Sequence, residues 1–114
     1  MIKTFSQVLQ FQVKPNKLDE FEKLIVAVKS EQEKLTGCLG VNYMKRFYIF
    51  DDVKKGEPPR ELTKIVKCVK YYAFLEYDTI ENCGKSVAWL FDNYEKEIIK
   101  LLISPFDIMS GYSL

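Results

Sequence analysis

The side chains able to do chemistry in this sequence are amides, carboxylates and phenols set among aromatic residues. Gln32 falls within the apolar stripe of a predicted helix, and Asn42 and Glu76 lie on apolar strand segments. A buried amide must find a hydrogen-bonding partner, so Gln32 either reaches water at the edge of its stripe or points into a cavity. The pattern supports polar recognition inside aromatic walls, and it assigns no catalytic residue.

Histidine is absent from the sequence. Its absence excludes Ser-His and Cys-His nucleophiles, His-based acid–base catalysis and axial His ligation of haem. The three cysteines, Cys38, Cys68 and Cys83, have neither an even count nor the spacing of a zinc site. We expect reduced thiols, no metal and no cofactor. Cys83 lies near a predicted helix start, which leaves a stabilised thiolate as an alternative.

Composition excludes several classes of partner. The chain has 114 residues, 17 basic against 16 acidic side chains and 47% hydrophobic residues. Such a balance is typical of a globular protein and lacks the basic excess of a nucleic-acid binder. No apolar run reaches the roughly 20 residues of a membrane-spanning helix, and the N-terminus alternates instead of forming a signal peptide. We therefore expect one cytoplasmic domain over residues 1–114, without nucleic-acid or membrane partners.

Hydrophobic periodicity predicts six main elements. Strands are expected from Thr4 to Val13, from Cys38 to Phe50 and from Thr63 to Tyr77, with a short strand after Pro105. A helix carries apolar residues from Leu18 to Leu35 and ends at Gly37. A short turn capped by Asp78 or Thr79 and a bend at Gly84 precede a second helix from about Lys85 to Ile103. The charged segment from Asp51 to Leu62 is predicted to be a long hairpin connection.

The order of these elements is βαββαβ, which predicts an α+β, ferredoxin-like fold. Its antiparallel four-stranded sheet would carry two helices on one face. The strand from Cys38 to Phe50 is apolar on both faces, so we interpret it as a central strand that is covered twice. Because the helices cover one face, we predict a homodimer joined through the open sheet face. Which parity faces the helices stays open, as does whether Trp89, expected on the polar side of its helix, meets a partner.

The chain also resembles a known family. The resemblance lies in the first strand that ends in Val13-Lys14-Pro15, in Phe21, in the Gly37–Gly40 segment and in the strand Ala73–Tyr77 with its Glu76. These features are similar to the antibiotic-biosynthesis monooxygenase domain of the dimeric α/β-barrel superfamily. The resemblance implies the dimeric α/β-barrel fold and cofactor-free oxidation of quinols and related aromatics. Haem-degrading members use Asn, Trp and His, and this chain departs from them because it has no His.

Two functions follow from the residues and the resemblance together. The first is a cofactor-independent, monooxygenase-like protein that acts on a small aromatic or quinol-type substrate in a cleft between sheet and helices. The alternative is a non-catalytic dimeric module that binds a ligand or a protein. The side chains expected to bind the aromatic molecule are Gln32, Asn42, Tyr43, Tyr72, Phe74, Glu76, Phe91 and Tyr94. Glu76 or a tyrosine would have to serve as the base.

Overall fold

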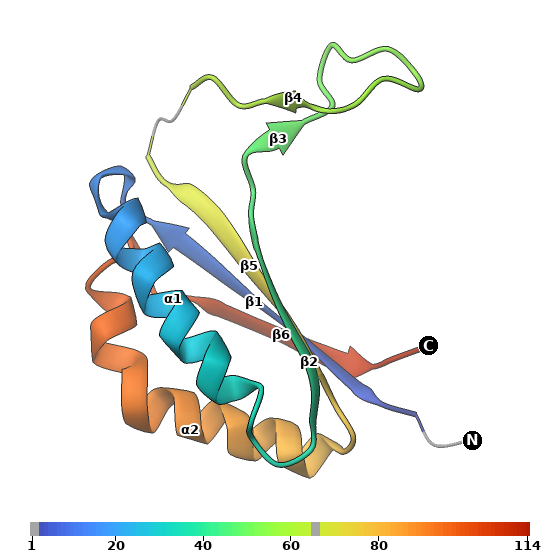
Figure 1. The fold of residues 1–114 in the computed structure, drawn as a ribbon, viewed down its shortest axis with the longest axis vertical. Coiled ribbons are helices and arrows are strands. Elements are labelled where there is room, and N and C mark those ends of the chain that lie inside the picture. The colour runs from blue at the N-terminus through green and yellow to red at the C-terminus, as the bar shows by residue number, and fades with distance from the viewer. Residues whose placement is uncertain (1–2, 65–66) are drawn as a thin grey trace.

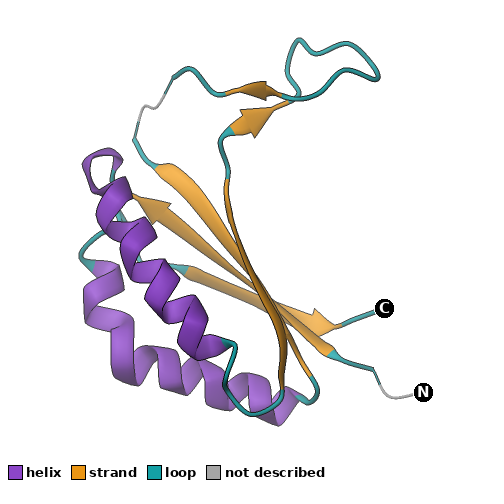
Figure 2. Ribbon diagram, viewed as in Figure 1, coloured by secondary structure: helices purple, strands orange, loops and turns teal. Residues whose placement is uncertain are grey.

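The computed structural model describes residues 3–64 and 67–114 (Figure 1). Ile65 and Val66, expected within the third strand, lie outside the described residues. The strands are β1 (Phe5–Val13), β2 (Cys38–Lys45), β3 (Tyr48–Ile49), β4 (Arg60–Glu61), β5 (Val69–Tyr77) and β6 (Asp107–Tyr112). A 3₁₀ turn (Pro15–Lys17) leads into helix α1 (Leu18–Gln32), and helix α2 spans Ile80–Ile99 (Figure 2).

The main sheet has four antiparallel strands in the order β2-β5-β1-β6. Both helices lie on one side of it (Figure 1). The predicted α+β, ferredoxin-like arrangement is therefore confirmed. None of the described helices is long and apolar enough to cross a bilayer.

The register decides which strand parity faces the helices. Along β1 the odd-numbered residues from Phe5 to Val13 are buried, and the even-numbered residues are only partly covered. Directly paired residues of an antiparallel sheet share a face. The helix face therefore carries Phe11 and Tyr71, whereas the other face, here called the open face, carries a row of Met109, Val8, Phe74 and Asn42.

The segment from Cys38 to Phe50 differs from its prediction in two ways. Its first part, β2, lies at the edge of the sheet, because β5 and not β2 pairs with β1. Its last residues leave that sheet, and β3 pairs instead with β4 in a separate two-stranded ribbon. The interpretation as one central strand was wrong. Apolar residues on both faces favour a strand that is covered on both sides, and this property does not specify which strands pair with it.

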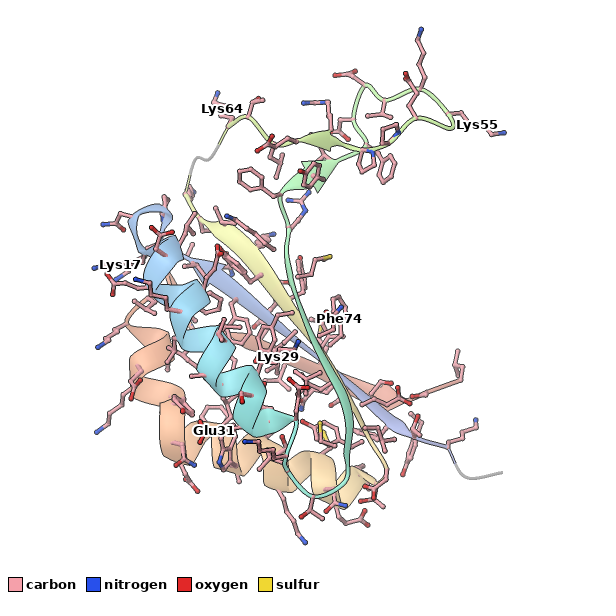
Figure 3. All side chains as sticks on the ribbon, viewed as in Figure 1. Lys17, Lys29, Glu31, Lys55, Lys64 and Phe74 are labelled. Carbon is pink, nitrogen blue, oxygen red and sulfur yellow. The ribbon has the colours of Figure 1, made fainter. Side chains whose placement is uncertain are left out.

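The predicted hairpin connection is a projecting arm. We use "arm" for residues 46–64, which join β2 to its antiparallel neighbour β5 and contain β3 and β4. In Figure 1 the helices lie to the left of the sheet and the arm turns to the right, toward the side of the open face. Figure 3 labels Lys55 near its tip and Lys64 near its return to the sheet.

The second helix is continuous where a bend was expected. Thr79 Oγ1 accepts a hydrogen bond of 3.1 Å from the backbone N–H of Asn82, and α2 then runs through Gly84. The cap satisfies one of the free N–H groups of the first turn, so the helix starts at Ile80 without a break. The first helix stops as predicted, since Gly37 has φ of +80° shortly after its last turn.

The core lies between the helices and the sheet. Its fully buried side chains include Phe11, Phe21 and Tyr77, which belong to one cluster of buried residues. Trp89 was expected on the polar side of its helix, but it is half-buried, packs against the core and meets Tyr94 edge to face at 5.6 Å. Its aromatic neighbour on the same helix explains this position.

Candidate functional site

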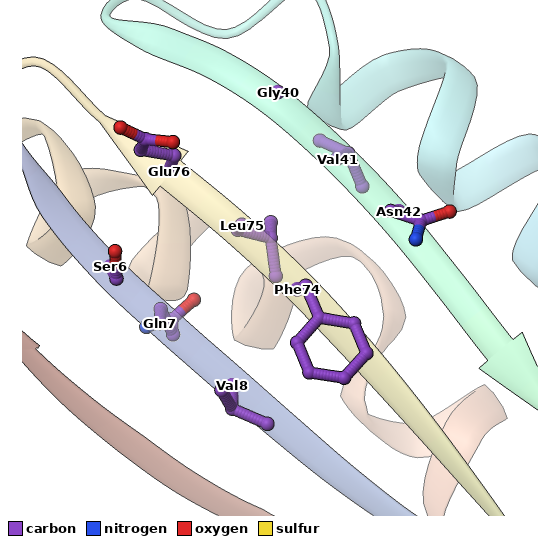
Figure 4. A pocket seen from close by; sticks show the side chains of 9 residues that line it. All are labelled: Ser6, Gln7, Val8, Gly40, Val41, Asn42, Phe74, Leu75 and Glu76. Carbon is purple, nitrogen blue, oxygen red and sulfur yellow. The ribbon is translucent and has the colours of Figure 1, made fainter. Parts of the chain in front are cut away.

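Two concave regions, one on each side of the sheet, hold four of the eight predicted binding residues. The first, the open-face hollow, has a volume of about 380 Å³ and lies over β1, β5 and β2 (Figure 4). Its lining includes Ser6, Val8, Asn42, Phe74 and Glu76. Asn42 and Phe74 are cross-strand partners, so the register itself places the amide beside the ring.

Polar groups close one end of the open-face hollow. Thr4 Oγ1 donates a hydrogen bond of 2.5 Å to Glu76 Oε1, and Ser6 and Ser113 share a bond of 2.6 Å between their hydroxyl oxygens. The two serines satisfy each other, and Thr4 occupies one Glu76 oxygen. The remaining lining is mostly apolar, with Asn42 and Gln7 as its other polar side chains.

The second region, the edge pocket, lies between α1 and β2 and has a volume of about 230 Å³. Its apolar walls come from Phe21, Ile25 and Val26 of α1 and from Met44 of β2. Glu22, Tyr43, Lys45 and Tyr71 add polar groups. A mostly apolar concavity with a few converging polar groups is the usual form of a small-molecule site.

Lys45, Glu22 and Tyr71 form one hydrogen-bonded cluster in the edge pocket. Lys45 Nζ lies 3.3 Å from Glu22 Oε2, and the Tyr71 hydroxyl donates to the same oxygen. The Tyr71 hydrogen bond lowers the pKa of Glu22, and Lys45 adds to that shift while burial opposes it. Burial and the same hydrogen bond raise the pKa of Tyr71. The cluster therefore holds an anionic carboxylate, a neutral phenol and an ammonium group.

The ammonium group of Lys45 also faces aromatic rings. Its Nζ lies 4.8 Å from the ring centroid of Phe47 and 6.0 Å from that of Tyr71. Both distances fall within the range of cation–π attraction. The Lys45 side chain is held at the pocket by this attraction and by Glu22, whose side chain is 49% exposed.

A buried amide lies behind the edge pocket. Gln32 is 1% exposed, and its Oε1 accepts a hydrogen bond of 2.8 Å from the Tyr43 hydroxyl. Burial raises the pKa of Tyr43, so its phenol is neutral. Gln32 does not reach water at the edge of its stripe, and its side-chain oxygen meets Tyr43. Gln32 fixes Tyr43 from the core side and leaves the other side of its ring to the pocket.

The remaining predicted residues lie elsewhere. Tyr72 stacks on Phe74 across the open face at 6.4 Å, and Figure 3 shows Phe74 on the side of the sheet away from the helices. Phe91 stacks on Phe106 at 5.6 Å, while Tyr94 donates a hydrogen bond to Glu31 of α1. The expectation of one cleft for all eight residues was wrong. Successive strand residues point to opposite faces, so Asn42 and Tyr43 cannot line the same cleft.

Two residues of the edge pocket were missed, although the sequence carried a signal for one of them. Lys45 is the one charged residue among the odd-numbered, otherwise apolar residues of its strand. A charged side chain in such a position suggests that it lies at the edge of the sheet or in a binding site. Glu22 gave no such signal, because it lies among other charged residues on the helix surface. Its closeness to Lys45 depends on how α1 lies over the sheet.

Metal binding and thiol chemistry find little support in the described residues. Across 3–64 and 67–114, no group of three or more Cys, Asp or Glu side chains could hold a metal ion. Cys83 is buried, accepts a hydrogen bond of 3.3 Å from Gln7 Nε2, and has its pKa raised by burial. Burial therefore favours the neutral thiol of Cys83 over a stabilised thiolate at the start of α2.

Comparison with known proteins shows the fold. No protein-family profile matches the sequence, and no curated protein matches it. Among solved structures, an antibiotic biosynthesis monooxygenase superposes with a TM-score of 0.68 at 12% identity, over 96% of this chain and 98% of its own. The predicted fold of antibiotic-biosynthesis monooxygenases is thereby confirmed.

Two further matches come from Streptomyces. A monooxygenase from the ActVA-Orf6 gene of Streptomyces coelicolor, in complex with nanaomycin D, has a TM-score of 0.66 at 11% identity and covers 98% of this chain and 88% of its own. SnoaB of Streptomyces nogalater, a cofactor-independent oxygenase, has a TM-score of 0.64 at 14% identity, with coverage of 97% and 95%. At these identities the likeness establishes the fold alone.

Proposed function

We propose that this protein is a homodimer that binds a small phenol- or quinol-type molecule in the edge pocket and oxidises it with O₂, without a cofactor. The observation that carries the proposal is the pairing of an aromatic and aliphatic pocket with the ammonium group of Lys45. The likeness to a cofactor-independent oxygenase and to a monooxygenase crystallised with an aromatic ligand supports the choice of chemistry.

Lys45 supplies the electrostatic part of the reaction. A phenol has a pKa of about 10, and a nearby fixed ammonium stabilises the phenolate form. The phenolate is electron-rich enough to react with O₂, while the apolar walls orient the ring and limit the access of water. For a simple phenol the balance is one phenol and one O₂ giving one quinone and one water. The four electrons lost by the ring reduce O₂, and one of its oxygen atoms remains on the ring.

Glu22 is assigned a positioning role in this scheme. Its pKa is lowered, so its carboxylate is too weak a base for a phenol. It holds Lys45 over the pocket across 3.3 Å, and Tyr71 holds Glu22 in turn. No residue is assigned as the base, and the substrate proton leaves to water at the pocket mouth.

A non-catalytic binding module is the second candidate. The observation that favours it is the same lowered pKa of Glu22, since the edge pocket then contains no group suited to take a proton near neutral pH. Binding would use the same walls and the same ammonium group. The two candidates differ only in whether O₂ is consumed.

The open face is the proposed dimer interface. Met44, Phe74 and Met109 lie on it and are each about half exposed, and Val8 joins them in the middle of the face. A contiguous apolar area on a sheet is typical of a protein–protein interface. A second copy packed on this face would also cover the open-face hollow, with Asn42 and Glu76 inside the interface.

Ligand binding and turnover can be tested together. Naphthol- and hydroquinone-type phenols are titrated by fluorescence, and O₂ uptake is followed with an electrode. We expect Lys45→Met to weaken binding by about tenfold, equivalent to about 1.4 kcal/mol. Lys29→Met, which removes a lysine paired with Glu33 on the surface of α1, is the matched control and should change nothing.

The outcomes separate the candidates. Binding with O₂ uptake supports the oxygenase. Binding that depends on Lys45 without uptake supports the binding module. No binding by the wild-type protein, or equal loss in both variants, overturns the edge pocket as the site.

The assembly has its own test. Light scattering after size exclusion should give twice the chain mass of 13.4 kDa. Phe74→Glu places a charge in the middle of the open face and should produce monomers. Ile80→Glu changes a similarly exposed apolar residue at the start of α2 and is the control. A wild-type monomer at micromolar concentration would overturn the homodimer.

A further inference from the structure

The arm is joined to the sheet at its base, where the backbone N–H of Arg46 donates to Lys70 O at 2.8 Å. Within the arm, the backbone N–H of Leu62 donates to Phe47 O at 2.7 Å. Farther out, Tyr48 pairs with Glu61 and Ile49 with Arg60. A two-stranded ribbon is marginally stable in water by itself. An arm of this length therefore gains order when it packs against another surface.

Two large aromatic side chains of the arm face solvent. Tyr48 is 57% exposed and Phe50 is 67% exposed. The neighbouring Phe47 is half-buried and contacts Lys45. The arm is therefore held in place at Phe47, whereas Tyr48 and Phe50 beyond it are exposed. Exposed aromatics on a ribbon offer a large apolar contact area at little entropic cost, because each has few rotatable bonds.

The direction of the arm relates these aromatics to the open face. The arm turns away from the helices and extends toward the side of the sheet on which Phe74 lies (Figures 1 and 3). The strand register places Met44 and Met109 on the same face. A molecule seated on the open face would lie beside the arm. The apolar surfaces of the sheet and of the arm therefore lie on two sides of the same space, next to the open face.

The open face alone covers less area than a standard protein–protein interface. Four strands at about 4.8 Å spacing and about seven residues at 3.3 Å cover roughly 440 Å² in projection. A standard interface buries about 800 Å² of accessible surface on each partner. Side chains that project from the sheet add accessible surface and account for part of this difference. The two exposed aromatic side chains of the arm add more.

We propose that the arm of each subunit lies against the second copy of this chain and buries Tyr48 and Phe50 there. The inference rests on the proposed homodimer and adds a second contact to it. Two-fold symmetry repeats the contact, so each subunit gives one arm and receives one. The charged tip, with Asp52, Lys54 and Lys55, stays at the solvated rim, where charges are usual in interfaces.

The test compares dimer dissociation constants by sedimentation velocity over a dilution series. Tyr48→Ser with Phe50→Ser should raise the dissociation constant by about tenfold or more, because aromatic anchors carry much of the energy of an interface. Ile80→Ser, an exposed apolar residue on α2, is the matched control and should leave it unchanged. Both arm residues are exposed in the isolated subunit, so the variant should keep the melting temperature of a wild-type sample diluted to monomer.

A second measurement reports the contact directly. Phe50→Trp in a Trp89→Phe background places the only tryptophan on the arm. Its emission should shift to shorter wavelength as the protein associates. A wild-type dimer with no change in dissociation constant and no emission shift overturns the arm contact and leaves the sheet-face dimer intact. A wild-type monomer overturns both.

Discussion

The hydroxyl of Tyr43 on β2 donates a hydrogen bond of 2.8 Å to the amide oxygen of Gln32 near the end of α1. This bond joins the edge strand to the helix above it. The Gln32 side chain is almost completely buried, so no water replaces Tyr43 if the hydroxyl is removed. The pair closes the inner side of the edge pocket.

Tyr43→Phe should therefore destabilise the fold by about 1–3 kcal/mol, because it leaves the Gln32 oxygen buried without a donor. Urea unfolding measures the change. The double variant Tyr43→Phe with Gln32→Leu should recover part of the loss, since both polar partners are then replaced. If the two single changes and the double change simply add, the bond is not coupled as the structure indicates.

Gly37 should not tolerate a side chain. Its φ is +80°, and an added Cβ would lie 2.2 Å from Asp78 Oδ1 and 2.3 Å from Asn82 Nδ2. Gly37→Ala should cost about 1–3 kcal/mol through the unfavourable backbone conformation and the crowding of these side chains. Gly84→Ala is the matched control: nothing lies within 4 Å of its Cβ, and within α2 it should stabilise by about 0.5–1 kcal/mol. Equal effects in thermal unfolding would contradict this contrast.

Acid stability should depend on Glu22. Its folded-state pKa lies below the ordinary value of a glutamate because Tyr71 donates to the carboxylate and Lys45 lies beside it. A lowered folded pKa contributes stability that is fully present above the unfolded pKa and is lost as pH falls through the folded pKa. Glu22→Gln should remove up to about 1 kcal/mol at pH 7, given the exposure of the pair, and less at pH 3, where more of the carboxylate is protonated.

Chemical denaturation of both proteins at pH 7 and pH 3 checks this expectation. Glu20→Gln is the comparison on the same helix, since Glu20 pairs only with the exposed Lys17. If Glu22→Gln has an effect of the same size at both pH values, the negative charge of Glu22 does not contribute to the stability of the fold.

Thiol labelling should distinguish the three cysteines. Burial raises the pKa of both Cys83 and Cys38, but Cys83 is buried whereas Cys38 and Cys68 are partly exposed. In the native protein, a thiol-specific reagent should modify Cys38 and Cys68 well before Cys83, because the thiolate is the reacting form and needs access. Mass spectrometry of digested samples locates the label. If Cys83 is labelled as early as Cys38 and Cys68, the prediction of an unreactive thiol at the start of α2 is wrong.

The order of elements was within reach of the sequence because each has a strong local signal. The alternation from Phe5 to Val13 and the stripe that begins at Leu18 need no knowledge of the rest of the chain. Gly37 and Thr79 mark helix ends through their own backbone and side-chain chemistry. The candidate site was predictable only in its residue types, since Tyr43 and Gln32 were named but their pairing was not.

What the sequence by itself determined is the βαββαβ order, the apolar surplus on both faces of the strands and the lack of histidine, all of which follow from composition and local periodicity. Only the tertiary structure decided that β2 lies at the edge, that odd-numbered residues of β1 and β5 face the helices, and that Lys45 meets Glu22. The physical reason lies in β5. Both faces of this strand are apolar, so the alternation of its side chains does not reveal which set faces the helices. Long-range strand pairing and helix packing decide between the two sets.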